Sequence, residues 1–547
     1  MSMEPLLRLY RKNWYSSEDI SVIGWVEFSG KVYEGEALLL LVQDYLQTGL
    51  MDEIDRISIW AKSLNGTFAI VVRCKDQLVL IADHVRSYPL VYSCREGQVI
   101  VSDHLLQCAK DLQLTLDPDI DKCEFFLTSG LVLGEHTVFK EWYAVQAAEV
   151  VVLTADNRDR KRYLTYRLNL SEGIELDIAD EVRKQNLIYK EAFDRMIKSA
   201  PQVHNWVLPL SGGHDSRMVL YRLYRAGIKN VICYTYGFPG NEQSRISKQL
   251  ADQLGYPWYF VEYTAEKWEQ LRNSRDFSAY FDFAFNGVSD PHLQDFLAVS
   301  ELKTQNILHD NDVFVPGHTF DFLTGAYCWD GLENMDSFED LCYYLRNYMD
   351  QWPCKKRTST VYKELGRFWL ESKLPFNQFT EYFFWQERHA KFIQNSLRVY
   401  EYFGFDWRTP LWDRSIMDYW QSIPLKDKLY RGFLYACEKK GLYEGAILSV
   451  PFDMEMVSGP SWKKTLLAGL PDFIVRRLKF HLKKDEMVND PLSTIYQSGM
   501  LKMDNLVSYR QLPEALRYYL SPYRKRPLCQ NPDNDVNSLF ALRNIFR

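Results

Sequence analysis

The stretch V-L-P-L-S-G-G-H-D-S-R-M-V-L, which runs from Val207 to Leu220, decides the fold class of this chain. Its first four residues are apolar or proline, as in a buried strand. From Ser216 onward, apolar residues recur at helical spacing. A strand that passes through Ser-Gly-Gly into a helix leaves backbone N–H groups free at the helix N-terminus, where the helix dipole adds positive potential. The stretch therefore predicts an anion site, and phosphate is the anion that suits it best.

The side chains of this loop refine the prediction. Ser211 and Ser216 can each donate a hydroxyl hydrogen bond to the same anion. Asp215 would repel phosphate unless Mg²⁺ lies between the two groups. We therefore expect a magnesium-bound polyphosphate at the C-terminal edge of a parallel sheet, the usual place for ligands in such folds. The G-x-x-x-x-G-K-[ST] pattern of the common P-loop is absent, and a plain strand–turn–helix made of small residues is the alternative.

The segments around the loop alternate between strand and helix patterns. A helix of about 20 residues is expected from Ile178 to Ser199. Further strands are expected at Asn230 to Tyr236 and at W-Y-F-V-E-Y, with a helix from Ile246 to Gly255 between them. This alternation is typical of a parallel sheet with helices on its faces. From about residue 335 the chain is expected to be mostly helical.

The first 165 residues show a different pattern of apolar residues. Short runs rich in β-branched and aromatic residues, such as T-F-A-I-V-V-R-C, predict strands. We expect one helix among them, from Glu34 to about Thr48. The change of pattern predicts two domains, residues 1–170 and 180–547. A chain of 547 residues is long enough for more than one domain.

Composition excludes several classes of protein. The net charge is −7, so the basic excess of a general nucleic-acid-binding protein is missing. Ten scattered cysteines form no C-x-x-C pair, so neither a zinc cage nor a disulfide framework is expected, and a reduced cytoplasm fits best. The first residues lack the apolar run of a signal peptide. The longest apolar run, E-A-L-L-L-L-V, is far shorter than a membrane span.

Several segments together resemble one enzyme family. L-S-G-G-H-D-S resembles the pyrophosphate loop of N-type ATP pyrophosphatases, in particular the synthetase domain of asparagine synthetases. Similar segments follow in the family's order over about residues 60–150 and 205–430: L-N-G-T-F-A-I-V-V, A-D-H-V-R-S-Y-P-L-V-Y, Y-T-Y-G-F-P-G-N-E, V-P-G-H-T-F-D-F-L-T-G-A-Y and Y-F-G-F-D-W-R-T-P-L-W-D. The resemblance implies a parallel-sheet, adenine nucleotide α-hydrolase-like domain with a helical C-terminal extension. It also implies a preceding α+β domain like those of N-terminal nucleophile (Ntn) hydrolases, with αββα layers.

The resemblance also implies an activity and a set of site residues. Enzymes of this family use Mg²⁺ and ATP to adenylate a carboxylate, release pyrophosphate, and then join the acyl group to an amine as AMP leaves. By resemblance, Asp215 and Asp321 hold Mg²⁺. The residues implied to hold ATP or its pyrophosphate are Leu210, Ser211, Gly212, Gly213, Asp215, Ser216, Tyr236, Gly237 and Gly317.

The N-terminus departs from the family pattern. Glutamine-dependent members begin Met-Cys-Gly and use the cysteine to release ammonia, whereas this chain begins Met-Ser-Met and its first cysteine is Cys74. Ser2 could be a nucleophile only if Met1 were removed. We therefore expect the N-terminal domain to be a structural remnant or a docking surface. The nitrogen donor would be ammonia or another amine, or a separate glutaminase would supply it.

The active-site segment departs from the pattern as well. His318 stands where asparagine synthetases place the glutamate that accepts the proton of the incoming amine. A histidine can do the same work, but aspartate is then less favoured as the substrate. The candidate carboxylates are aspartate, a uronic acid of a sugar and a peptide side chain. A hydrogen-bonded loop histidine without a chemical role is the alternative for His318.

A lysine that the family uses to stabilise the transition state has no counterpart here. Arg388 is the candidate replacement, with Lys391, Lys439 and Lys440 nearby in sequence. His214 is expected to serve packing or local hydrogen bonding. Interleaved basic and apolar residues at 461–484 suggest either a membrane-surface contact or a solvated helix face. A non-catalytic ATP-binding protein and a glutamine-dependent enzyme using Ser2 stay open as functions, as does a homodimer.

Overall fold

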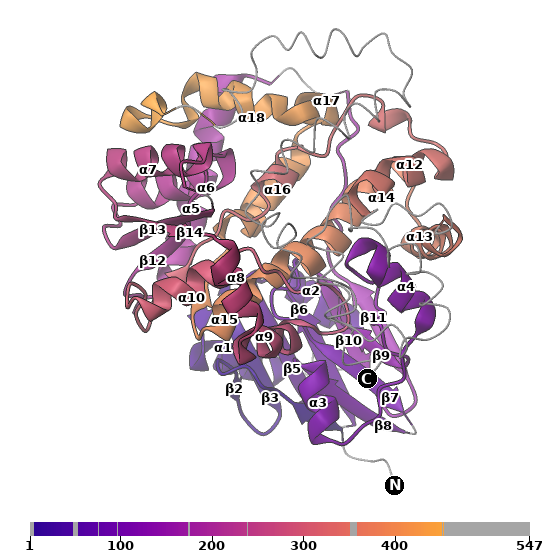
Figure 1. Ribbon diagram of the computed structural model, residues 1–547. Helices are drawn as coiled ribbons and strands as arrows, with labels where there is room; N and C mark the ends of the chain where they lie inside the picture. The colour runs from indigo at the N-terminus through magenta and orange to yellow at the C-terminus, as the bar shows by residue number, and fades with distance from the viewer. Residues whose placement is uncertain are drawn as a thin grey trace, which may run out of the picture.

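The structure is a computed structural model that describes residues 5–47, 53–74, 76–95, 97–172, 176–237, 239–349, 358–450 and 452. Two sheets from the N-terminal part lie at the bottom of Figure 1, and a parallel sheet with its helices lies at the upper left. The C-terminal helices run across the top and down onto the N-terminal sheets. Trp385 donates from Nε1 to the carbonyl oxygen of His84 at 2.8 Å, so the two halves are joined by buried hydrogen bonds.

The N-terminal part contains two sheets. The larger has the order β11-β10-β6-β5-β3-β2, with β4 paired to β3, and the smaller has the order β1-β8-β7-β9. The strands of the larger sheet are β2 (Tyr15–Ser16), β3 (Ile20–Phe28), β4 (Lys31–Glu34), β5 (Asn65–Cys74), β6 (Gln77–Ala82), β10 (Glu149–Leu153) and β11 (Arg158–Arg162). Those of the smaller sheet are β1 (Leu6–Arg8), β7 (Val91–Arg95), β8 (Gln98–Ser102) and β9 (Trp142–Ala144).

Helices cover the outer faces of this pair of sheets. Because side chains alternate along a strand, Phe68 and Ile70 of β5 share one core with α1 and α2, whereas Ala69 and Val71 share another with the smaller sheet. Residues of α3 and α4 join that second core. The helices are α1 (Glu36–Gln47), α2 (Ile54–Ser63), α3 (Leu105–Asp111) and α4 (Ile120–Ser129). The layers are therefore helix, sheet, sheet and helix, while kinship with Ntn hydrolases stays a prediction.

The prediction of a single helix in this part was wrong. The expected helix at Glu34 to Thr48 is α1, but α2, α3 and α4 also form. These three helices are only 7 to 10 residues long, and periodicity alone does not distinguish such short apolar segments from strands. α2 also carries three isoleucines, which favour strands in single-sequence reasoning.

The second part contains the parallel sheet that the alternating pattern predicts. Its order is β14-β13-β12-β15-β16, and every neighbouring pair is parallel. The strands are β12 (Trp206–Pro209), β13 (Val231–Gly237), β14 (Trp258–Glu262), β15 (Val313–Phe314) and β16 (Asp406–Trp407). Helices α5 (Ile178–Lys198), α6 (His214–Arg225) and α7 (Glu242–Leu254) confirm the helical expectations.

The strand order places the Ser-Gly-Gly loop at a special point of this sheet. The chain moves outward from β12 to β13 and β14, and later strands β15 and β16 add on the other side of β12. The carboxyl end of β12 therefore faces the crevice where the winding direction reverses, which is where open α/β sheets bind ligands.

The remaining described chain is mostly helical, as expected from residue 335 onward. Its helices are α8 (Ala265–Arg272), α9 (Arg275–Ala284), α10 (Phe296–Thr304), α11 (Phe320–Leu323), α12 (Phe338–Met349), α13 (Thr358–Ser372), α14 (Phe376–Phe383), the π-helix η3 (Phe384–Ile393), the 3₁₀ turn η4 (Gln394–Leu397), α15 (Arg398–Tyr402), α16 (Arg414–Ser422), α17 (Leu425–Lys428) and α18 (Gly432–Cys437). None of the described helices has the length and hydropathy to cross a membrane. The basic stretch 461–484 lies outside the described residues, and the domain bounds 1–170 and 180–547 stay a prediction.

Candidate active site

The loop between β12 and α6 folds around its two serine hydroxyl groups. Ser216 Oγ accepts the backbone N–H of Ser211 at 3.0 Å and lies 3.0 Å from Ser211 Oγ. The backbone N–H of Gly213, at the N-cap of α6, donates to Ser211 Oγ at 3.3 Å. Leu210 extends the strand, because its N–H donates to the carbonyl oxygen of Tyr234 at 2.8 Å. The predicted strand–loop–helix is confirmed, and both hydroxyl groups stand at the N-terminus of a 12-residue helix.

Two carboxylates and a guanidinium converge beside this loop. Asp215, in the first turn of α6, accepts the backbone N–H of Asp321 on Oδ2 at 3.0 Å. On Oδ1 it accepts Nη2 of Arg431 at 2.9 Å. Arg431 Nε donates to Thr324 Oγ1 at 2.9 Å, which ties the arginine to the end of α11. The structure thus brings Asp215 and Asp321 together, 106 residues apart in sequence.

The electrostatics of this cluster favour an added cation. The pKa of Asp215 is raised to about 6, chiefly because the carboxyl group is buried and also because Asp321 lies nearby, while Arg431 opposes the rise. Two neighbouring carboxylates in a partly desolvated site are stabilised by a positive ion between them. Oxygen ligands of this kind are those that Mg²⁺ prefers. The residues therefore fit a Mg²⁺ ion held by Asp215 and Asp321, with the serine loop beside it for a phosphate group.

Position 317 requires glycine because the backbone there lies against the backbone of Asp215 and Ser216, which leaves no room for a side chain. A Cβ atom at this position would lie 2.6 Å from the backbone nitrogen of Ser216 and 2.7 Å from the backbone carbon of Asp215. The segment that follows β15 therefore runs directly against the first turn of α6. Thr319, two residues later, has a φ of 80°, an uncommon value for a β-branched residue. This strained turn delivers His318 and Asp321 to the site.

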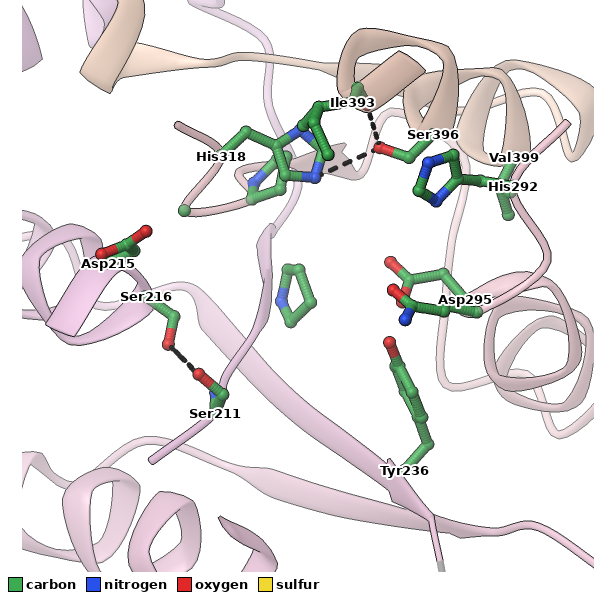
Figure 2. Close-up of a pocket in the computed structure, with 14 residues that line it drawn as sticks. Ser211, Asp215, Ser216, Tyr236, His292, Asp295, His318, Ile393, Ser396 and Val399 are labelled. Carbon is green, nitrogen blue, oxygen red and sulfur yellow. Dashed lines mark hydrogen bonds between the residues drawn. The ribbon is translucent and has the colours of Figure 1, made fainter. Parts of the chain in front are cut away.

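A cavity of about 250 Å³ opens next to the loop. Figure 2 shows its walls: Ser211, Asp215 and Ser216 on one side, and His292, Asp295, Ser396 and Val399 on the other. His318 closes it from above and Tyr236, at the end of β13, from below in this view. The cavity therefore joins the loop at 211–216 to side chains from four other segments.

Buried hydrogen bonding sets the properties of His318. Its Nε2 lies 3.2 Å from Ser396 Oγ, and its Nδ1 is buried without a hydrogen-bond partner among the described residues. Burial lowers the pKa of His318 to about 4, although Asp321 opposes the shift. The imidazole is therefore neutral at pH 7, with one nitrogen protonated and the other carrying a lone pair.

The opposite wall is held by a carboxylate with three tyrosines. Asp295 accepts hydrogen bonds from Tyr400 at 2.5 Å and Tyr234 at 3.1 Å. Burial raises its pKa, and the hydroxyl groups of Tyr400, Tyr236 and Tyr234 lower it. The Tyr236 ring also stacks on Tyr263, with centroids 4.9 Å apart. These contacts fix the Tyr236 side chain at the cavity; its expected backbone contact with adenine, and that of Gly237 beside it, stay predictions.

The structure does not bring the candidate cation Arg388 to the cavity. Arg388 lies in η3, with Nε 3.5 Å from the hydroxyl group of Tyr327. Lys391 is buried in an ion pair with Glu387 at 2.7 Å. The cation that touches the predicted metal ligands is Arg431. Arg431 lies just beyond residues 205–430, over which the family resemblance extends, so none of the quoted motifs marks it.

The smaller expectation for His214 has a clear outcome. His214 Nδ1 pairs with Glu438 Oε1 at 2.8 Å, and its ring stacks on Phe452 at 4.1 Å, so the prediction of a packing and hydrogen-bonding role is confirmed. Ser2 lies outside the described residues. The residues that sequence reasoning missed are Arg431, Thr324, His292, Asp295 and Ser396.

Comparisons with known proteins found only remote similarities. No protein-family model and no curated protein matches this sequence. Among solved structures, the NH₃-dependent NAD synthetase of Campylobacter jejuni is 14% identical with a TM-score of 0.20, over 41% of this chain and 96% of that chain. The NMN synthetase of Francisella tularensis is 13% identical with a TM-score of 0.20, over 40% and 97%. The glutamine phosphoribosylpyrophosphate amidotransferase of B. subtilis is 11% identical with a TM-score of 0.19, over 45% and 72%. Similarity at this level assigns no activity to this chain.

Proposed function

We propose that this protein is an AMP-forming ligase of the asparagine synthetase type. It would activate a carboxylate as an acyl-adenylate with release of pyrophosphate, and then form an amide as AMP leaves. One observation carries the proposal: Asp215 and Asp321 meet beside a two-serine loop at a helix N-terminus, in the crevice where the strand order reverses. Carboxylate pairs and N–H-rich loops occur together where magnesium-bound polyphosphates are held.

The residues divide into roles that follow from their positions. Ser211, Ser216 and the backbone of Gly212 and Gly213 would hold the pyrophosphate, and Leu210, Tyr236, Gly237 and Gly317 would line the nucleotide. Asp215 and Asp321 would hold Mg²⁺, which supplies charge neutralisation for the phosphates when bound. Arg431, which already lies 2.9 Å from Asp215, would take the role of the missing lysine and stabilise negative charge in the transition state.

The far side of the cavity suits the second half-reaction. His318 would accept the proton of the amine that attacks the acyl-adenylate, since its imidazole lines the cavity and is neutral at pH 7. The amine would be ammonia, a substrate amine or ammonia from a separate glutaminase. The carboxylate would be aspartate, a uronic acid or a peptide side chain.

The test is magnesium-dependent exchange of labelled pyrophosphate into ATP, across aspartate, glutamate, hexuronic acids and a carboxylate-bearing peptide. We expect exchange with one class of carboxylate, and its loss in Asp321→Asn and Asp215→Asn. Asp252→Asn, which changes an exposed aspartate of α7 outside the cavity, is the matched control and should exchange like the wild type. Hydrolysis of ATP to ADP with no exchange would contradict the proposal.

A second function is favoured by the same ion pair. Arg431 occupies one oxygen of Asp215, and the backbone N–H of Asp321 occupies the other. If that pairing persists in the presence of nucleotide, the protein would bind ATP without turning it over. Measurable ATP binding by calorimetry, with no exchange for any carboxylate, would establish this non-catalytic alternative. Use of Ser2 as a glutaminase nucleophile would instead be excluded by intact-mass analysis that finds Met1 retained.

A further inference from the structure

Two histidines and an aspartate meet at the edge of the parallel sheet opposite the serine loop. His204 precedes β12, and His309 and Asp312 precede β15. Because β12 and β15 are adjacent and parallel, with Trp206 paired to Val313, the residues before them meet at the amino-terminal edge of the sheet. The four residues of β12 span about 13 Å, so this group is separate from the cavity at the carboxyl end of the strand.

The three side chains lie close enough to share one ion. One ligand atom of each, a ring nitrogen or a carboxylate oxygen, lies within 4.8 Å of the other two. Nδ1 of His204 lies 3.1 Å from Oδ1 of Asp312, and the two imidazole rings have centroids 4.9 Å apart. Ligand atoms around a tetrahedral Zn²⁺ ion, with bonds of about 2.0–2.2 Å, lie about 3.4 Å apart. The His204–Asp312 pair already has nearly that separation, and a rotation of the His309 ring would complete the set.

Backbone and amide hydrogen bonds fix the carboxylate of Asp312. Its Oδ1 accepts the backbone N–H of Asn205 at 3.0 Å and Nδ2 of the same residue at 2.9 Å. Its Oδ2 accepts the backbone N–H of His309 at 2.8 Å. Hydrogen bonds of this kind orient carboxylates that bind metal ions. A carboxylate oxygen offers about two lone-pair sites. Within the described part of the chain Oδ2 has that single donor, so one site is left for an ion.

The two histidines are free to adjust to an ion. The side chain of Asp312 is buried, but that of His204, which touches it, is 55% exposed, and His309 is exposed as well. Exposed imidazole rings can turn without repacking a core, so a cation from solvent can replace the direct contact between His204 and Asp312. Imidazole nitrogens together with one carboxylate oxygen suit Zn²⁺, whereas Mg²⁺ prefers oxygen ligands throughout.

We propose that His204, His309 and Asp312 form a binding site for a divalent transition-metal ion, with Zn²⁺ as the ion that these ligands favour and water in the fourth position. The ion cross-links the amino ends of β12 and β15. The segments that follow the carboxyl ends of the same two strands carry Asp215 and Asp321. The ion therefore stabilises the folded sheet beneath the candidate active site. The site does not depend on the proposed ligase activity.

The first test is calorimetric titration of metal-free, full-length protein with Zn²⁺. Excess Mg²⁺ is present so that the Asp215–Asp321 pair is occupied by the ion it prefers. We expect the wild type to bind one Zn²⁺ ion more than His309→Gln, or to bind that ion at least about tenfold more tightly. His204→Gln should show the same loss. Equal stoichiometry and affinity in all three proteins would overturn the proposal, because binding elsewhere on the chain is common to them.

Asp310→Asn is the matched control. Asp310 is exposed in the same turn and carries a negative charge, but it does not belong to the group of three ligands. Its affinity for Zn²⁺ should stay within about twofold of the wild type, since a single exposed charge contributes little. An equal loss in Asp310→Asn and His309→Gln would mean that the charge of the turn attracts the ion, and would overturn the assignment of the three ligands.

Thermal unfolding gives a second readout. At a Zn²⁺ concentration about 100 times the dissociation constant, the unfolding midpoint of the wild type should rise by about 2–4 °C. The midpoints of His204→Gln and His309→Gln should not rise, and without Zn²⁺ they should equal that of the wild type, because both rings are exposed. An equal rise in the variants would contradict the proposal. Failure to bind Zn²⁺ in protein that supports pyrophosphate exchange would refute this site and leave the proposed function intact.

Discussion

Two aspartates, Asp83 and Asp215, occur in similar sequence contexts but make different contacts in the structure. A-D-H-V-R-S contains Asp83 and S-G-G-H-D-S contains Asp215, each with a histidine and a serine close by. Asp83 is fully buried, and its oxygens accept the backbone N–H groups of Phe68 at 2.9 Å, Val85 at 2.8 Å and Ser87 at 3.2 Å. The side chain of Asp215 is 24% exposed, and it meets one backbone N–H and one arginine.

The two carboxylates differ in whether their hydrogen-bond partners can be exchanged for a ligand. Backbone N–H groups in a closed turn cannot leave Asp83, so that carboxylate holds the fold of the N-terminal sheets. Arg431 reaches Asp215 from a separate segment, and a guanidinium can exchange its place with a cation or a phosphate. The same residue types therefore make a structural turn in one place and a candidate binding site in the other.

Exchange of each aspartate for asparagine gives the largest contrast. We expect Asp215→Asn to fold and to lose at least about 10²-fold of pyrophosphate exchange, because one proposed Mg²⁺ ligand is lost. Asp83→Asn should instead lose about 2–4 kcal/mol of unfolding free energy, because an amide NH₂ group would face backbone N–H donors. Urea unfolding and exchange, measured on both variants, check this. An unstable Asp215→Asn and an inactive but stable Asp83→Asn would reverse the comparison.

The next effect separates the two candidate cations. Arg431→Ala should lower exchange by about 10²-fold, since the guanidinium that lies against Asp215 is removed from the charged cluster. Arg388→Ala should lower it by less than about threefold, because Arg388 meets Tyr327 and the Phe392 ring rather than the phosphate loop. Rates of exchange at saturating ATP decide between them. A larger loss in Arg388→Ala would restore Arg388 as the transition-state cation.

A smaller effect is expected from the close approach at Gly317. Gly317→Ala places a methyl group 2.6 Å from a backbone nitrogen of α6, so the first turn of the helix must shift. We expect a loss of about 1–3 kcal/mol of stability and weaker ATP binding. Gly227→Ala is the control, because its Cβ meets open space and only its φ of +76° is strained. Calorimetry should show weaker ATP binding in the first variant only.

The smallest effect concerns stability below neutral pH. Burial lowers the pKa of His389 and of His292 to about 3, and that of His318 to about 4. The unfolded chain therefore binds these protons from about pH 6.5 downward while the folded chain does not, so stability falls as the pH drops from 6.5 toward 4. Each histidine contributes up to about 2 kcal/mol of that loss at pH 5.

His389→Phe tests this loss of stability at acidic pH, because phenylalanine keeps an aromatic ring at the site but cannot bind a proton. Both ring nitrogens of His389 are buried and have no hydrogen-bond partner within the described part of the chain, and the ring stacks on Phe322 with centroids 4.7 Å apart. The variant should therefore show a smaller difference between its urea midpoints at pH 7.5 and pH 5 than the wild type. An unchanged difference would mean that His389 titrates normally in the folded protein.

Local pattern was enough to predict part of this structure. The loop at 211–216 with its strand and helix followed from local pattern, because it depends on neighbouring residues. The meeting of Asp215 with Asp321 followed only from the family resemblance. Arg431 could not be found this way, because it lies 216 residues from Asp215 in the sequence. It also adopts a φ of 64°, and no glycine stands at that position to indicate a turn. Ser396 depends on the π-helix and 3₁₀ turn around it, which periodicity does not reveal.

The most direct test of the central claim follows one oxygen atom. The carboxylate that supports exchange would be labelled with ¹⁸O, and the products of a turnover with amine would be analysed by mass spectrometry. Attack on the α-phosphorus of ATP predicts one ¹⁸O atom in AMP and none in the pyrophosphate released at the serine loop. Label in inorganic phosphate, together with ADP, would mean attack on the γ-phosphorus. It would contradict the assignment of Ser211, Ser216 and Asp215 to a departing pyrophosphate.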